Sequence, residues 1–580
     1  MSVGDRLGGS FIQPDLVDQW SDATLRDELT SMRSMNMNTV VLQWSANSYD
    51  KREGNSKTSV YPTALNGFRK TTNTDVVDRV LREASSQGMS VWMGLQVNDQ
   101  WWDVYAGDRT WLDREADTAI NIAADIKTRY GHYAALDGWY LSFELDNVHF
   151  GTPAAVDNIT HFYNRAIEGI KGWARQDVVA VAPFYNAITT GLPGWQNAAQ
   201  FGETWRQVLE NTDIDVISLQ DGIGAGHATV AMLPEWFAAM RKAITDADSS
   251  AILISDTETF FIGASGLQPM PAKDIIAAVK AVDPYVDGYW SFSYNHYQSA
   301  RSKFGSTAYD AAYRAWTQNR SGDGTDGSRP STPTGLTAVT LSPQIVQLFW
   351  GASTDSGSGV AGYHIYRNGE LVADKISPQG GFTDHQLDGG ATYSYQIRAF
   401  DGSGLESDLT ATVTASTPNL PGAPTNFARC GAQDGQPGCS YDLIGAPADP
   451  AYPDSGGTEL TDGLRGPEYF DHQWQGRNAA GKYSFVVRLG EQSKPIKEIN
   501  TRWFQVREYY AFLPPTVKYY TSNDGTNFQE QRTITTPAVS ARMQAKTYRS
   551  IDLNVDAKYV KVEIDGGSAW TMLDEIEVRG

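Results

Sequence analysis

Two apolar runs of the sequence end on carboxylates. Residues 138–147 read GWYLSFELDN and carry Glu144, and residues 251–261 read AILISDTETFF and carry Glu258. A strand that only closes a core has no reason to end on an acid, so both positions are candidates for reactive groups. Two carboxylic acids that flank one bond can serve as general acid–base and as nucleophile, which is what cleavage of a glycosidic bond requires.

Eight short runs of β-branched and aromatic residues are expected to hold these acids in place. Between residues 8 and 316 they alternate with longer amphipathic segments, which predict helices. The runs begin at Gly8, Asn38, Ser90, Gly138, Val178, Asp215, Ala251 and Gly288. Eight such strand–helix units predict a (β/α)8 TIM barrel. An open doubly wound sheet is the alternative, but residues 8–15 read GGSFIQPD and lack the GxGxxG phosphate loop of such sheets.

The C-terminal ends of the eight runs define the expected active site, because catalytic residues of such barrels lie there. Carboxylates, amides and aromatic rings dominate these ends, and lysine and arginine are almost absent. This composition argues against a phosphate site or a Schiff-base lysine and fits a sugar. The candidate substrate-binding residues are Gln13, Trp44, Gln96, Asn98, Trp101, Trp102, Asp146, Asn147, Tyr185, Asn186, Gln220, Asp221, His227, Asp256, Tyr294 and His296.

Several of these residues could have either of two roles. Asp256 lies two residues before Glu258 and, by strand alternation, on the same face, so one acid would be the nucleophile and the other would support it. We favour Glu258 as the nucleophile, because it lies farther along the strand than Asp256, where the substrate would be. Asp221, in LQDGIG, is either a substrate-binding acid or a turn residue. Trp101 and Trp102 follow a strand in polar company and are expected to form subsite walls.

The chain after the barrel shows only short strands and two linkers. We expect the barrel at 1–318 and a linker at 319–331, where the sequence is rich in Gly, Ser, Pro and Asp. A first β-domain at 332–418 and a second linker at 419–425 follow. The first β-domain resembles a fibronectin type III domain on the segments IVQLFW, AGYHIYRNGE and ATYSYQIRAFD, and LDGGATYSYQIRA matches the tyrosine-corner region of such sandwiches.

Residues 426–580 resemble a discoidin (coagulation-factor type C) domain, a β jelly roll. The segments ELTDG, VVRLGE, VKYYTSNDGTNF and AKYVKVEIDGGSAWTMLDEIEV carry the resemblance. It implies a structural Ca²⁺ held by Asp462 and Glu575, whose hard oxygens suit that ion. It also implies sugar contacts at one rim, although each candidate could equally belong to the core. These candidates are Trp474, Trp503, Tyr509, Tyr510 and Trp570.

The barrel itself resembles two known groups. A large clan of retaining glycosidases places its acid–base after the fourth strand and its nucleophile after the seventh, where Glu144 and Glu258 stand. The clan usually has an asparagine before the acid–base, and this chain has Phe143. The segments FELDN, SLQDGIG and TETF also resemble the barrel family catalogued as DUF4434. The resemblances imply a secreted retaining glycoside hydrolase acting on a polysaccharide. The alternatives are a non-catalytic carbohydrate-binding protein and an inverting enzyme that uses Glu144 with Asp221 or Asp256.

Composition limits the classes of partner that the protein is expected to bind. The formal net charge of −21 argues against nucleic-acid or anionic-lipid partners, and no run of 18 apolar residues predicts membrane insertion. No cofactor is expected for catalysis, because no metal-ligand motif such as HExxH is present. Cys430 and Cys439 either form a local disulfide or remain as two free thiols. The modular organisation is typical of secreted enzymes, so we expect an extracellular protein whose signal segment has been removed; no oligomeric state is indicated.

Overall fold

The structure is a computed structural model of the 580-residue chain. It describes residues 7–172, 177–190, 192–318, 326–385, 387, 389–418, 425–429, 441–449, 452–453, 457, 459–461, 463, 465–466, 474–478, 481–506, 511–536, 543–567 and 569–580. Cys430, Cys439, Asp462, Tyr509 and Tyr510 lie outside the described residues.

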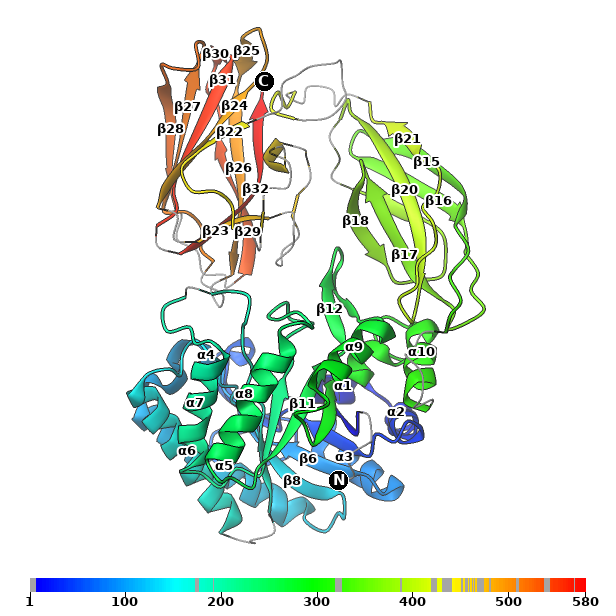
Figure 1. Ribbon diagram of the computed structural model, residues 1–580, viewed down its shortest axis with the longest axis vertical. Coiled ribbons are helices and arrows are strands. Elements are labelled where there is room, and N and C mark those ends of the chain that lie inside the picture. The colour runs from blue at the N-terminus through cyan, green and yellow to red at the C-terminus, as the bar shows by residue number, and fades with distance from the viewer. Residues whose placement is uncertain are drawn as a thin grey trace.

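Eight parallel strands close into a barrel, as the sequence predicts (Figure 1). Around the barrel the strands follow the order β1-β14-β11-β10-β9-β8-β6-β2. Their bounds are β1 Gly9–Ile12, β2 Thr39–Leu42, β6 Ser90–Gly94, β8 Leu136–Leu141, β9 Val179–Val181, β10 Val216–Gln220, β11 Ile252–Glu258 and β14 Gly288–Phe292. The fourth and seventh strands in chain order, β8 and β11, are therefore the strands that lead to Glu144 and Glu258.

Helices surround the barrel, and their ends carry recognisable capping residues. The side chain of Ser21 accepts a hydrogen bond at the start of α2, and Asn197 and Gln200 form a reciprocal capping box at the start of α7. The helices are α1 Pro14–Gln19, α2 Asp22–Ser34, α3 Val76–Gln87, α4 Trp101–Val104, α5 Arg109–Tyr130, α6 Pro153–Lys171, α7 Ala198–Leu209, α8 Leu233–Asp246, α9 Ala272–Val282 and α10 Thr307–Gln318. No helix in the described part of the chain is long and apolar enough to cross a membrane.

Short elements decorate the end of the barrel that carries the candidate site. A small sheet has the order β5-β4-β3-β7, β12 and β13 form a hairpin directly after β11, and a π-helical turn follows β14. Their bounds are β3 Ala46–Asp50, β4 Ser56–Ser59, β5 Phe68–Lys70, β7 Gln96–Val97, β12 Phe260–Gly263, β13 Gly266–Pro269, and Tyr294–Gln298 for the π-helical turn. Two 3₁₀ turns span Lys51–Glu53 and Tyr105–Gly107.

Aromatic rings fill the interior of the barrel. Phe11, Trp92, Tyr140 and Trp290 belong to one buried cluster, and the ring centroids of Trp92 and Trp290 lie 5.3 Å apart. These large rings form the floor below the C-terminal ends of the strands. Because alternate residues of a strand face the same side, the cluster identifies which residues of each strand point inward.

The first region after the barrel is a two-sheet β-sandwich. One sheet has the order β15-β16-β19 and the other β18-β17-β20-β21. The strands are β15 Thr334–Ser342, β16 Ile345–Gly351, β17 Val360–Arg367, β18 Glu370–Lys375, β19 Phe382–Asp384, β20 Thr392–Asp401 and β21 Val413–Ser416. Trp350, Tyr363 and Tyr395 lie in the core between the sheets.

The C-terminal region is a second β-sandwich. Its sheets have the orders β22-β24-β31-β27-β28 and β23-β32-β26-β29, with β25 and β30 paired separately. Its elements are β22 Tyr441–Ile444, a 3₁₀ turn at Glu459–Thr461, β23 Gln475–Asn478, β24 Lys482–Arg488, β25 Lys494–Ile496, β26 Glu498–Val506, β27 Thr516–Ser522, β28 Gln529–Thr535, β29 Met543–Ser550, β30 Val555–Ala557, β31 Tyr559–Asp565 and β32 Trp570–Arg579. Trp474, Trp503 and Trp570 are buried in its core, so the structure decides the open question about these rings in favour of packing.

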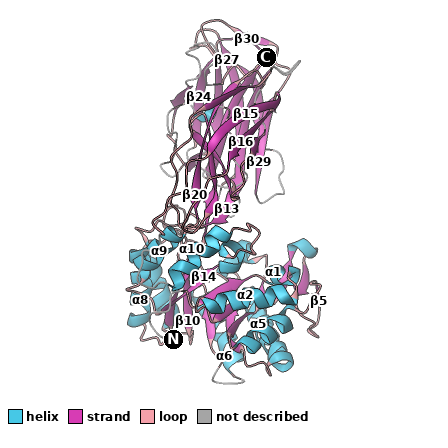
Figure 2. Ribbon diagram, turned by 90° about the vertical axis from the view of Figure 1, so that its right-hand side faces the viewer, coloured by secondary structure: helices cyan, strands magenta, loops and turns pink. Residues whose placement is uncertain are grey.

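Both sandwiches lie at the same end of the barrel (Figure 2). The first contacts the β12–β13 hairpin, where the backbone N–H of Ala264 and the side chain of Gln268 donate to Oδ2 of Asp374 over 2.9 and 2.8 Å. The second contacts the barrel through Leu192, which packs against the cluster containing Trp474. Because the hairpin follows the C-terminal end of β11, this is the end of the barrel that carries Glu258.

Candidate active site

The pattern of inward-facing residues places acids and amides above the aromatic floor. Tyr140 and Ile254 face the barrel interior, so alternation directs Glu144, Asp256 and Glu258 toward the same space. The same rule brings Gln220 inward from β10. The charges of these acids also affect one another's pKa values, as described below, which is expected of acids that lie near one another.

Glu258 is buried and is held by the loop after β10. The backbone N–H of Ala225 donates to its Oε2 over 2.8 Å, and the N–H of Gly224 makes a further hydrogen bond. Burial raises the pKa of Glu258 to about 7, while these two donors act in the opposite direction because they stabilise the ionised form. Gly224 permits this approach, since a Cβ there would lie 2.2 Å from the carbonyl oxygen of Phe260.

Glu144 is partly buried and occupies a different environment. Burial raises its pKa to about 7, the side chain of Gln220 opposes the shift by a hydrogen bond, and the charge of Glu258 raises the pKa further. The backbone carbonyl of Glu144 accepts a hydrogen bond from the indole N–H of Trp101 over 3.1 Å. The segment that carries the acid is thus fixed from behind by the indole.

Asp221 and Asp256 complete a group of four carboxyls. Burial raises the pKa of Asp256 well above its ordinary value, with further contributions from the charges of Glu258, Asp221 and Glu144. Burial and the charge of Glu258 raise the pKa of Asp221 in the same direction. Among the described residues, no lysine or arginine contributes to the shifts of these four acids. All four shifts have the same direction, because four unscreened negative charges in one buried space oppose full ionisation of the group.

Two histidines at the rim are held neutral. Burial lowers the pKa of both His227 and His296 to about 4. Nε2 of His296 accepts the backbone N–H of Gln13 over 3.2 Å, so its ring proton resides on Nδ1. The ring of His227 stacks on Phe184 with centroids 5.7 Å apart. Both rings can hydrogen-bond a neutral ligand without adding charge.

Several residues that were expected to contact substrate at the rim pack against other parts of the protein instead. Trp101 is 2% exposed, and its ring stacks on Phe143 and on Phe150 at centroid distances of 5.0 and 5.7 Å. This placement argues against a subsite wall at Trp101, because the buried ring already packs against protein. Trp102 and Trp44 are partly exposed and remain candidates for stacking on a sugar.

The buried amides expected to bind substrate also support loops. The side-chain amides of Gln96 and Asn98 donate to Glu115, and Asn147 donates to the backbone carbonyls of Asn186 and Gln196. Four further candidates are also held within the protein. Asp146 accepts from the N–H groups of Val148 and His149, Asn186 accepts from those of Ile188 and Thr189, Tyr294 donates to Asp310, and Tyr185 stacks on Trp236. These residues hold the site in place from behind.

The structure adds two candidates, Tyr297 and Phe184, that the sequence did not indicate. Tyr297 is buried, and burial together with the charge of Glu258 raises the pKa of its hydroxyl to about 12. Phe184 follows the inward-facing Ala182 by two residues, and strand alternation was the signal that could have found it. Gln43, which the sequence places at the end of the second strand, follows the inward-facing Val41 in the same way.

Only one of the two residues expected to hold calcium in the C-terminal region lies within the described part of the chain. Asp462 lies outside the described residues. Glu575 is buried in β32, and its Oε1 accepts the backbone N–H of Gly463 over 3.3 Å. A bound Ca²⁺ at this position remains a proposal.

Fold and site together define a (β/α)8-barrel protein with a four-carboxyl site at the C-terminal ends of its strands, followed by two β-sandwiches. Residues 7–303, just over half of the chain, match the family model described as a domain of unknown function (DUF4434), so the chain belongs to this family.

Other known proteins match either a short segment of the chain or the chain at low sequence identity. An alpha-amylase of Niallia circulans is 38% identical over 93 residues, which are 16% of this chain and 7% of the relative. Exoglucanase B of Cellulomonas fimi is 39% identical over 101 residues, which are 17% and 9%. The chain thus spans less than a tenth of the length of either relative. An endo-beta-1,4-mannanase from Thermotoga petrophila is 12% identical with a TM-score of 0.40, covering 72% of this chain and 99% of that one.

Proposed function

We propose that this protein is a retaining glycoside hydrolase in which Glu144 is the general acid–base and Glu258 the nucleophile. The observation that carries the proposal is the electrostatic relationship of the two acids. They stand at the ends of β8 and β11, burial raises the pKa of each to about 7, and the charge of Glu258 raises the pKa of Glu144. Such a pair shares its protons, which suits one acid and one nucleophile acting on a glycosidic bond.

The hydrogen bonds divide the two roles. Two backbone N–H groups favour the ionised form of Glu258 and fix its orientation, as a nucleophile requires. Glu144 experiences the negative charge of Glu258, which favours keeping its proton for the leaving group. After the glycosyl–enzyme forms, that charge is gone, and Glu144 can act as base toward water.

The surroundings of the pair favour a neutral, hydroxyl-rich substrate. Oε1 of Gln43, Oδ1 of Asp256 and Oδ2 of Asp221 are buried and have no hydrogen-bond partner. Buried polar atoms in that condition are costly unless a ligand or water engages them. Sugar hydroxyls can donate to and accept from such groups, while the partly exposed rings of Trp44 and Trp102 can stack on a sugar face.

The β-sandwiches support action on a polymer. We assign residues 332–418 to the fibronectin type III class and residues 426–580 to the discoidin-like class, on the sequence resemblance of each. The alpha-amylase and the exoglucanase that share a segment with this chain are named for activity on polysaccharides. A carbohydrate-binding module beside a hydrolytic site raises the effective concentration of polymer there. The proposed location is extracellular.

An inverting mechanism is the second candidate. The charge of Glu144 contributes to the raised pKa of Asp256, so these two acids also lie close enough to interact. In that case Asp256 or Asp221 would activate water and Glu144 would protonate the leaving group. The stereochemistry of the product separates the two mechanisms.

The test is release of reducing ends from a panel of bacterial exopolysaccharides and plant glycans by the full chain. Glu144→Gln and Glu258→Gln should each remove activity on the glycan that the wild type cleaves. Glu168→Gln, at an exposed position on α6, is the matched control and should retain it. A wild type that binds glycans without releasing reducing ends would identify a carbohydrate-binding protein. NMR of the first product should show retention at the anomeric carbon.

A further inference from the structure

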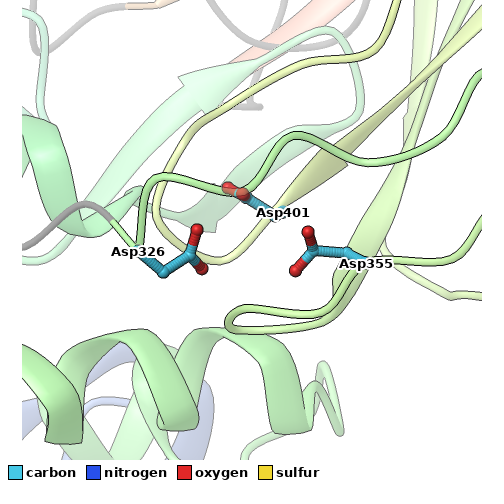
Figure 3. Close-up of side chains that lie close together, drawn as sticks. All are labelled: Asp326, Asp355 and Asp401. Carbon is cyan, nitrogen blue, oxygen red and sulfur yellow. The ribbon is translucent and has the colours of Figure 1, made fainter.

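Three carboxylates converge at the junction between the barrel and the first β-sandwich (Figure 3). Asp326 belongs to the segment that leaves the barrel, Asp355 to the loop between β16 and β17, and Asp401 to the end of β20. One oxygen from each lies within 4.8 Å of those from the other two. The three acids come from separate parts of the chain, so the fold alone brings them together.

Asp401 provides the evidence that the group is built for a ligand. Its side chain is fully buried, and Oδ1 accepts hydrogen bonds from Oγ of Ser403 and from the N–H groups of Gly404 and Leu405. Oδ2 is equally buried and has no hydrogen-bond partner. An unpartnered carboxylate oxygen in the interior is costly, and the carboxylate of Asp401 lies close to those of Asp326 and Asp355 (Figure 3).

Asp355 shows the same division between its two oxygens. Oδ2 accepts the backbone N–H groups of Gly357 and Gly359 over 3.0 and 2.8 Å, while Oδ1 is buried without a partner. Asp326 is fixed by the N–H groups of Ser328 and Ser358. Among the described residues, no lysine or arginine forms an ion pair with any of the three acids. Hydrogen-bond donors of the protein thus orient each side chain, and they bring three negatively charged carboxylates close together.

Hard oxygen ligands that carry several negative charges suit a divalent hard cation. Ca²⁺ accepts irregular sets of carboxylate, carbonyl and water oxygens, whereas Mg²⁺ demands near-ideal octahedral geometry. Three acids from two irregular segments and the end of a strand fit the former.

We propose that Asp326, Asp355 and Asp401 form a Ca²⁺ site that fastens the interdomain segment to the first β-sandwich. The loop that follows Asp401 also contacts the barrel, because the backbone carbonyls of Gly402 and Ser403 accept the N–H groups of Ala272 and Lys273 at the start of α9. An ion bound to Asp401 therefore stabilises the joint between barrel and sandwich. It is separate from the active site and from the site proposed at Asp462 and Glu575.

Calorimetric titration of Ca²⁺ into the full chain, stripped by chelator and desalted, tests the proposal, with Mg²⁺ as the comparison ion. The informative variants are Asp326→Ala, at an exposed position, and Asp401→Asn, which keeps the size and the accepting oxygen of the side chain. Asp408→Asn is the control, because Asp408 lies on the surface of the same sandwich outside the group.

The wild type should bind Ca²⁺ in preference to Mg²⁺. Each of the two site variants should weaken one equivalent of Ca²⁺ binding at least about tenfold, leaving any second equivalent in the C-terminal region unchanged. Ca²⁺ should raise the melting temperature of the wild type and of Asp408→Asn by more than that of the site variants. Circular dichroism confirms that each variant is folded. Absence of Ca²⁺ binding by the wild type at millimolar concentration, or equal binding by wild type and both site variants, would overturn the proposal.

Discussion

The backbone N–H of Ala225 donates a hydrogen bond to Oε2 of Glu258 over 2.8 Å. The donor belongs to the glycine-rich loop after β10, and the acceptor lies at the end of β11, so two adjacent strands fix one carboxylate. An oriented N–H group stabilises negative charge without having to reorganise during the reaction. The contact depends on Gly224, whose missing Cβ allows the loop to pass beside Phe260.

Gly224→Ala should therefore reduce activity without abolishing folding of the barrel. The new methyl group would lie 2.2 Å from the carbonyl oxygen of Phe260 and 3.1 Å from Oε2 of Glu258, so the loop must move away. We expect a decrease in kcat of about 100-fold, the scale of a misplaced reacting group. Gly107→Ala is the control, since nothing lies within 4 Å of a Cβ there. Equal kinetics for both variants would show that the loop does not position Glu258.

Chemical rescue distinguishes the roles of the two glutamates. Glu144→Ala should slow substrates with poor leaving groups by about 10²–10⁴-fold and spare activated aryl glycosides, because only the former need protonation. Azide should then yield a glycosyl azide of retained configuration. Glu258→Ala should lose activity on every substrate, and azide should give the inverted product. If Asp256→Ala or Asp221→Ala is inactive while Glu258→Ala is not, the nucleophile has been assigned to the wrong acid.

Activity should follow a bell-shaped dependence on pH. Burial raises the pKa of both Glu144 and Glu258 to about 7, and the reaction needs Glu258 ionised and Glu144 protonated. Activity falls at low pH as Glu258 gains its proton and at high pH as Glu144 loses its own, and the two limbs report the pair rather than single residues. Measurements of kcat/KM on an activated substrate should show that Glu144→Gln loses the alkaline limb. Persistence of that limb would assign it to another group.

The buried acids should make the protein less stable as pH rises. A carboxyl whose pKa is higher in the folded than in the unfolded state favours folding while protonated, and this contribution disappears as pH rises through the folded value. Asp256→Asn keeps the shape of the protonated acid and removes its ionisation. It should raise the free energy of unfolding by roughly 1–3 kcal/mol at pH 8 and change it little at pH 5. Melting temperatures of both proteins at the two pH values provide the measurement; an equal effect at both would exclude ionisation as the cause.

Adjacent tryptophans should respond differently to truncation. Trp101 packs against two phenylalanines, so Trp101→Ala should destabilise the fold by about 3–5 kcal/mol. Trp102 is partly exposed, and Trp102→Ala should remain folded while KM on a polysaccharide rises. Denaturant unfolding and steady-state kinetics separate the two effects. A stable, kinetically altered Trp101→Ala would restore the expectation that this ring contacts substrate.

The sequence by itself determined the barrel and the strands that carry the two glutamates. Eight β-branched and aromatic runs alternate with helical segments, and this local pattern is strong because every strand must bury both faces. Since the C-terminal ends of barrel strands converge, chain order alone placed Glu144 and Glu258 in one region. The relation between Asp256 and Glu258 likewise followed from the period of a strand.

Only the tertiary structure decided which residues near those ends face the site. Trp101, Gln96 and Asn147 lie near strand ends in polar company, yet their side chains pack on phenylalanines or donate to backbone carbonyls of a helix and a loop. Loop conformation depends on contacts with distant segments, which no local pattern encodes. The convergence of Asp326, Asp355 and Asp401 has the same origin: three segments separated in the chain, one of them the end of β20, meet only in the folded protein.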